Sequence, residues 1–123
     1  MVYVVDDEPS VGRALARLLW SGGYEGRIFT SAEEFLMNSG DEGPACLLLD
    51  AKMPGMGGEA LLGYVRERGL PYGVVFVTAH ASEELSRRVR AGGAVACLAK
   101  PPMVQELLAA VEAALADARS RAA

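Results

Sequence analysis

Residues 45–50 of the chain read Ala-Cys-Leu-Leu-Leu-Asp, five apolar residues in a row that end at a carboxylate. A half-buried strand alternates apolar and polar side chains, whereas a run that is apolar throughout indicates a strand covered on both faces. Such strands lie in the middle of parallel sheets. We therefore interpret Ala45–Leu49 as a central parallel strand, with Asp50 at its carboxyl end.

Similar apolar runs lie on both sides of this strand in the sequence. They are Met1–Val5, Tyr24–Phe29, Gly73–Val77 and Ala94–Leu98. The segments between them carry apolar residues at helical spacing, and the first stripe consists of Val11, Ala14, Leu15, Leu18 and Leu19. Five strand–helix units of similar length predict an α/β fold, with a parallel sheet, right-handed crossovers and helices on both faces.

Capping and turn residues mark the ends of the expected helices. The first helix opens near Pro9, and Gly22-Gly23 stops it. Ser31 stands at the start of the second helix with Glu34 at the capping-box position. A helix from about Ser82 ends in the same way at a second pair of glycines.

The final helix has an apolar stripe that continues to Leu115 and is lost from about Ala116 onward. We therefore assign residues 1–117 to one domain. We interpret residues 118–123 as a fraying helix end or as the start of a linker to an output domain that is not in this chain.

Bulk composition narrows the classes of function. The chain has 16 acidic and 12 basic residues among 123, and this net charge of −4 gives the domain no overall attraction to nucleic acid or anionic membrane. No apolar run has the length of a membrane span. Cys46 and Cys97 are too few and too far apart for a zinc site or a disulfide framework. We expect a soluble, cytoplasmic protein with reduced thiols.

Polar side chains gather at the carboxyl ends of the expected strands: Asp6, Asp7, Asp50, Thr78 and Lys100. Each has an ordinary interpretation by itself, such as a helix cap for Asp7 or a turn residue for Asp50. However, the carboxyl ends of parallel strands share one edge of the sheet, where α/β proteins bind ligands. We therefore expect the five side chains to converge.

Together these residues suit phosphoryl transfer. Three neighbouring carboxylates repel one another, and a divalent cation that prefers oxygen ligands, Mg²⁺ or Mn²⁺, offsets that repulsion. Asp50 is then a carboxylate nucleophile that forms an aspartyl phosphate, while Thr78 and Lys100 contact phosphoryl oxygens. The chain contains ten arginines and only two lysines, which favours a specific role for the ammonium of Lys100.

Four segments carry a family resemblance: VVDDEP at 4–9, LLLDAKMPGMGG at 47–58, VFVTAHA at 75–81 and CLAKP at 97–101. In order and spacing they resemble the receiver domains of bacterial two-component response regulators, most of all the TodT/FixJ type. The resemblance covers residues 2–115. It implies a flavodoxin-like, doubly wound, five-stranded parallel sheet of order 2-1-3-4-5 with helices on both faces.

The resemblance also implies a function. Asp50 would accept the phosphoryl group from the phosphohistidine of a sensor histidine kinase, and the Lys100–Pro101 peptide bond would be cis. It assigns the metal site to Asp7, Asp50 and the backbone carbonyl of Lys52, with Asp6 acting partly through water. The chain would then be a phosphoacceptor signalling domain that catalyses only its own phosphorylation and dephosphorylation, rather than a turnover enzyme.

In this family, phosphorylation alters the face built here from helix 82–91, strand 94–98 and helix 103–117. The resemblance therefore implies a homodimer that forms through this face on phosphorylation. It also implies control of an output domain outside this chain, a DNA-binding transcription regulator. The receiver domain itself is expected to bind neither nucleic acid nor membrane.

Three residues near the site call for separate predictions. Lys52 and His80 border the expected phosphoryl site, and we expect them to tune the lifetime of the aspartyl phosphate. Cys97 stands where the family usually has Tyr or Phe, three residues before the lysine. We expect switching to use the loop after Thr78 and the helix that follows, with Cys97 filling space.

Three alternatives are weaker. A phosphatase of the haloacid-dehalogenase type needs an acidic residue two positions after the nucleophile, and position 52 is lysine. A pseudo-receiver would normally lack one of the acidic residues or the lysine. A flavin carrier needs a loop that cradles phosphate after the first strand, and residues 6–8 are instead Asp-Asp-Glu, which repel an isolated phosphate.

Overall fold

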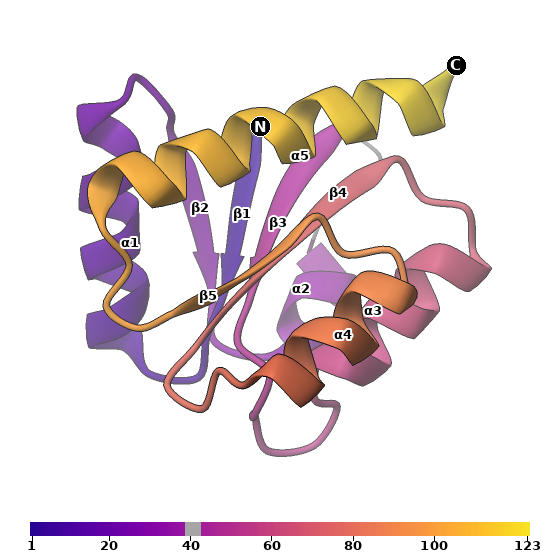
Figure 1. Ribbon diagram of the computed structural model, residues 1–123, viewed down its shortest axis with the longest axis horizontal. Coiled ribbons are helices and arrows are strands. Elements are labelled where there is room, and N and C mark those ends of the chain that lie inside the picture. The colour runs from indigo at the N-terminus through magenta and orange to yellow at the C-terminus, as the bar shows by residue number, and fades with distance from the viewer. Residues whose placement is uncertain (39–42) are drawn as a thin grey trace.

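A computed structural model describes residues 1–38 and 43–123, in which strands and helices alternate strictly (Figure 1). The strands are β1 Val2–Val5, β2 Gly26–Phe29, β3 Ala45–Leu49, β4 Tyr72–Thr78 and β5 Ala96–Ala99. The helices are α1 Pro9–Ser21, α2 Ala32–Asn38, α3 Gly58–Glu67, α4 Glu83–Ala91 and α5 Val104–Ala122.

The sheet is parallel throughout and has the order β2-β1-β3-β4-β5, which confirms the predicted topology. Its register aligns Val5 of β1 with Leu49 of β3, and Leu49 with Phe76 of β4. β3 lies at the centre, as its continuous apolar sequence predicted. The alignment brings the carboxyl ends of the strands to a common edge.

The sheet divides the core into two layers, because successive side chains of a strand point to opposite faces. Tyr3 and Val5 of β1 belong to the core under α2, α3 and α4. Val2 and Val4 belong to the core under α1 and α5. Figure 1 shows the same division, with α5 and α1 on one side of the sheet and α2 to α4 on the other.

Two strands begin two residues later than the sequence pattern predicted, for the same reason. The backbone N–H of Tyr24 donates to the carbonyl of Leu19, and that of Ala94 donates to the carbonyl of Val89. These residues close the preceding helix and are therefore not free to start the sheet ladder. Each closure follows a Gly-Gly pair whose second member, Gly23 or Gly93, has positive φ.

The helix starts agree with the capping signals. The hydroxyl of Ser31 accepts the backbone N–H of Glu34 at 2.9 Å. The Glu34 carboxylate accepts the N–H of Thr30 at 2.7 Å, one residue before the expected capping-box partner. Ser82 caps α4 by accepting the N–H of Leu85 at 3.0 Å. These bonds satisfy amides that a helix leaves unpaired in its first turn.

The last helix extends to Ala122, so the predicted domain boundary at residue 117 falls within α5. Ala118 is fully buried, and Arg121 forms an ion pair with Asp117 at 2.7 Å. The linker to an output domain stays a prediction. In the part of the chain that the structure describes, no helix combines the length and apolarity needed to cross a membrane.

Candidate functional site at the carboxyl edge of the sheet

The sheet ladder continues one residue beyond three of its strands and so fixes the backbone of the site. The N–H of Asp6 donates to the carbonyl of Phe29, and that of Asp50 to the carbonyl of Val5. The N–H of Lys100 donates to the carbonyl of Thr78 at 3.0 Å. These bonds hold the candidate residues rigidly at the edge of the sheet.

Charged side chains meet there with little exposure to water. The Lys100 ammonium nitrogen lies 2.6 Å from Oδ2 of Asp6 and 3.6 Å from Oδ2 of Asp50. Asp6 is 1% exposed, Asp50 7% and Thr78 0%. The Asp50 carboxylate also accepts hydrogen bonds from the Thr78 hydroxyl and the Lys52 backbone N–H. The predicted convergence of Asp6, Asp50, Thr78 and Lys100 is therefore observed.

Burial and neighbouring charge act on Asp50 in opposite directions. Burial raises the pKa of its carboxyl group, and the negative charge of Asp6 adds to the increase. The Lys100 ammonium and the two hydrogen bonds oppose this, but the net shift of the pKa is upward. Asp50 is thus a partly desolvated carboxylate, held by three donors.

Lys100 shows the complementary balance. Burial by itself lowers the pKa of the ammonium, but the hydrogen bond to Asp6 and the charges of Asp6, Asp50 and Glu8 outweigh it. The net pKa is raised, so Lys100 is a fixed positive charge at neutral pH. A fixed cation beside a carboxylate can stabilise negative charge that develops there.

The acidic side chains also fit a divalent cation. Among the described residues, one group of three acids has ligand oxygens within 4.8 Å of one another: Asp6, Asp7 and Glu8. Oδ2 of Asp6 is buried, and its one polar contact among the described residues is the Lys100 ammonium. Carboxylate oxygens are the ligands that Mg²⁺ prefers, so the donor set suits it.

This group differs from the ligand set that the family resemblance implied. Glu8 belongs to it although it was not among the predicted ligands, and Asp50 lies outside it. The signal for Glu8 was its position directly after two candidate ligands, at the N-cap of α1. Asp7, as predicted, lies beside Asp6 and is half-buried.

The remaining candidates lie around the rim. Lys52 and His80 are both exposed, and the backbone N–H of His80 approaches the Thr78 hydroxyl at 3.3 Å. The Lys100–Pro101 peptide bond is cis, as the resemblance implied.

Neither cysteine has the low pKa of a reactive thiol. Cys97 is half-buried against the core under α4, and burial raises the pKa of its thiol although Arg90 opposes the shift. Cys46 is fully buried, which raises its pKa to about 12. A high pKa leaves little thiolate at neutral pH, which argues against a redox role, and the space-filling role of Cys97 stays a prediction.

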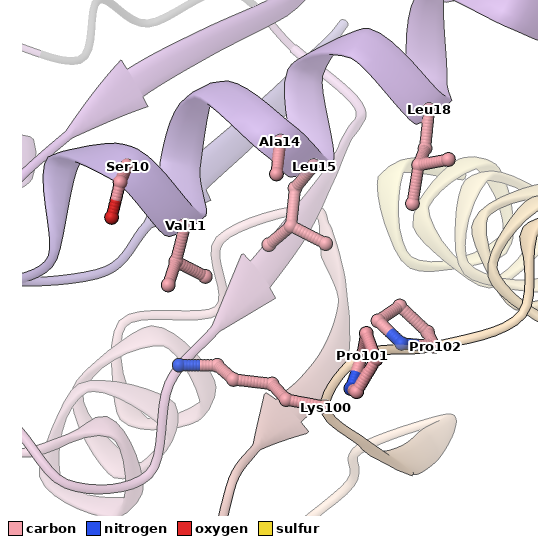
Figure 2. A pocket seen from close by; sticks show the side chains of 8 residues that line it. All are labelled: Ser10, Val11, Ala14, Leu15, Leu18, Lys100, Pro101 and Pro102. Carbon is pink, nitrogen blue, oxygen red and sulfur yellow. The ribbon is translucent and has the colours of Figure 1, made fainter.

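A cavity of about 310 Å³ adjoins the site on the α1 side. Its lining is Ser10, Val11, Ala14, Leu15, Leu18, Lys100, Pro101 and Pro102. Figure 2 shows the apolar side chains of α1 facing the two prolines across the cavity, with the Lys100 side chain extending along one end. The lining is almost entirely apolar, and it lies next to the residue that contacts Asp50.

Comparison with known proteins agrees with this geometry. The family described as "Response regulator receiver domain" matches residues 2–112. Nodulation protein W of Bradyrhizobium diazoefficiens is 36% identical over 121 residues, which are 98% of this chain and 53% of that protein. The response regulator TodT of Pseudomonas putida is 33% identical over 115 residues, 94% of this chain and 51% of that protein.

Solved structures give the same result. The FixJ-N crystal structure has a TM-score of 0.85 and 30% identity, covering 94% of this chain and 92% of that one. The fold and the edge site define a signalling domain of two-component systems. The chain belongs to the response regulator receiver domain family. It spans about half the length of the curated relatives it matches.

Proposed function

We propose that Asp50 is the phosphoacceptor, and that the phosphohistidine of a sensor histidine kinase is the donor. The observation that carries this proposal is the contact set of the Asp50 carboxylate: the Lys100 ammonium at 3.6 Å, the Thr78 hydroxyl and the Lys52 amide. All three are donors, so they can hold one carboxylate oxygen in place while the other attacks phosphorus.

In the transfer step, an Asp50 oxygen forms the new P–O bond while the P–N bond to the donor imidazole breaks. The electron pair of the P–N bond goes to the imidazole, which ends as neutral histidine. Lys100 and Thr78 then contact phosphoryl oxygens, on which negative charge is spread during the reaction. Because Thr78 is buried, Lys100 is partly buried and both are held by the sheet, little reorganisation is needed.

Asp6 and Asp7 would hold Mg²⁺, with oxygens of Asp50, the Lys52 carbonyl and Glu8 as the remaining protein ligands. The ion would supply positive charge to the phosphoryl oxygens. The surplus of carboxylates over cations at this edge supports the assignment. Without the ion, Lys100 alone faces the buried acids.

Mass spectrometry after incubation with acetyl phosphate tests the proposal, with Mg²⁺ or EDTA, on the wild type and on Asp50→Asn. We expect one added phosphoryl group in the wild type with Mg²⁺ and none in the other three conditions. The variant keeps the size and shape of the side chain. Phosphorylation of Asp50→Asn at the wild-type rate would rule out Asp50 as the acceptor, and no phosphorylation of the wild type would favour a pseudo-receiver.

We further propose that the kinase contacts the apolar cavity beside Lys100. Asp50 is only 7% exposed, so a donor must cover the edge of the sheet on which Lys100 lies. The cavity is immediately adjacent and offers an apolar surface to a protein partner.

Ala14→Arg places a long charged side chain at this cavity from an exposed helix position. We expect about a tenfold or larger loss of phosphoryl transfer from a histidine kinase that phosphorylates the wild type, since a buried unpaired charge opposes docking. Transfer from acetyl phosphate should stay unchanged. Ala113→Arg, an identical change at an exposed position of α5, is the control. Equal transfer rates in both variants would contradict this placement.

The proposed phosphorylation of Asp50 suggests a signalling role for the whole domain. We propose that the domain works in the cytoplasm and catalyses only its own phosphorylation and dephosphorylation. Phosphorylation would alter the face of α4, β5 and α5, favour a homodimer and control a transcription-regulating output domain. The relatives support this output, since TdiR of Thauera aromatica is described as a transcriptional regulatory protein.

A further inference from the structure

Glu33, in the first turn of α2, contacts a loop that is far from it in sequence. Its Oε2 accepts the backbone N–H of Met56 at 2.9 Å, across 23 residues. That hydrogen bond is the first cause of a lowered pKa of the Glu33 carboxyl group, so the side chain is ionised at neutral pH. A charged acceptor makes a stronger hydrogen bond than a neutral one.

The loop in question, residues 51–57, joins Asp50 to α3 and has few other anchors. α3 has glycine at its N-cap, and no side chain caps its first turn. Gly55 has φ of +74°, and a Cβ at that position would lie 2.7 Å from Oε2 of Glu33. The turn is thus shaped to let the carboxylate approach the backbone closely.

Near its start, the same loop contacts the site. The backbone N–H of Lys52 donates to the Asp50 carboxylate, and the Lys52 carbonyl is an expected metal ligand. Met53 is buried in the core between these two ends. A loop fixed at Met53 and Met56 has less freedom to move the peptide of Lys52.

We infer that Glu33 is a positioning residue for the phosphoryl site: through Met56 it holds the loop that presents the Lys52 amide to Asp50 and the Lys52 carbonyl to the metal. This inference rests on the proposed function. It adds a residue from α2, an element that contributes no side chain to the site itself.

Glu34 provides a matched control, because it is the next residue of the same helix turn. Its carboxylate accepts the Thr30 N–H and stabilises the start of α2 without touching the loop. If Glu33 acted only by stabilising α2, Glu34→Ala would have at least as large an effect. Glu33→Gln keeps an acceptor oxygen and should restore part of the function.

The test has two readouts, and the first needs no metal. In EDTA, amide hydrogen exchange at Lys52 should be about fivefold faster in Glu33→Ala than in the wild type, the factor expected for one lost hydrogen bond. Glu34→Ala should match the wild type at Lys52. Equal exchange at Lys52 in the two variants would overturn the inference.

The second readout is the Kd for Mg²⁺, followed by amide chemical shifts. We expect it to increase about fivefold in Glu33→Ala, less in Glu33→Gln and by less than twofold in Glu34→Ala. An unchanged Kd in Glu33→Ala would also overturn the inference. A wild type that binds no Mg²⁺ would instead refute the proposed function, and Lys52 exchange would still decide whether Glu33 positions the loop.

Discussion

The two edges of the sheet each hold a partly buried cation, in opposite surroundings. At the carboxyl edge, Lys100 lies between the carboxylates of Asp6 and Asp50, and its net pKa is raised. At the amino edge, Arg66 donates to the carbonyl of Tyr72 and lies near Arg121. Burial, with the positive charge of Arg121, lowers the pKa of Arg66.

Lys100 and Arg66 differ in the charges around them rather than in how deeply they are buried. Three acids act on Lys100 at the carboxyl edge, namely Asp6, Asp50 and Glu8, and Asp7 lies beside Asp6. This surplus of negative charge is costly unless a cation is bound. Arg66 instead donates to a backbone carbonyl and has Asp117 as an opposing charge. One edge gathers more acids around its cation than the cation neutralises, whereas the other ties its cation to a backbone carbonyl.

Replacing each cation by alanine should distinguish the two edges. The largest expected effect is the loss of phosphorylation rate in Lys100→Ala. Lys100→Ala should slow phosphorylation by acetyl phosphate by about 100-fold or more, the typical cost of losing one preorganised donor to a developing charge. Arg66→Ala should change that rate by less than about twofold while lowering the melting temperature. Rates come from mass spectrometry at fixed Mg²⁺, and circular dichroism checks that both variants fold.

Lys100→Arg sharpens the comparison, because it retains the charge and changes its shape. A planar guanidinium cannot take the place of a compact ammonium between two carboxylates, so we expect a rate between those of the wild type and Lys100→Ala. If Arg66→Ala slowed phosphorylation as much as Lys100→Ala does, the two edges would not differ in this way.

The sequence predicted the fold because its patterns are local and strong. Continuous apolar runs identified the buried strands, and the helix stripes identified the covering layers. The apolar runs predict that β2 and β5 start two residues before they do, because Tyr24 and Ala94 are apolar in sequence but use their amides to close a helix. A hydropathy pattern does not record where a backbone N–H donates.

The site was predictable to a similar degree. Strand ends of a parallel sheet must share an edge, so the meeting of Asp6, Asp50, Thr78 and Lys100 followed from the fold. Two features did not follow. Lys100 lies closer to Asp6 than to Asp50, which depends on side-chain conformation. The contact of Glu33 with Met56 joins segments 23 residues apart and has no sequence signature.

The smaller expected effect concerns stability and pH. Burial raises the pKa of Asp50 above its ordinary value of 3.8, so the folded protein binds this proton more tightly than the unfolded chain does. Stability from this group is present below the ordinary pKa and is lost as the pH rises through the raised, folded pKa. In EDTA at pH 7, Asp50→Asn should therefore melt higher than the wild type, by roughly 5 °C.

The gain should disappear as the pH is lowered toward 3, where Asp50 is protonated in both folded and unfolded chains. Asp117→Asn, at the amino edge, is the control, because it removes a partly exposed ion pair with Arg121 and relieves no buried charge. We expect no increase in its melting temperature at any pH. If Asp50→Asn also gave no increase at pH 7, Asp50 would carry no electrostatic strain in the metal-free protein, and the contrast between the edges would reduce to Lys100 alone.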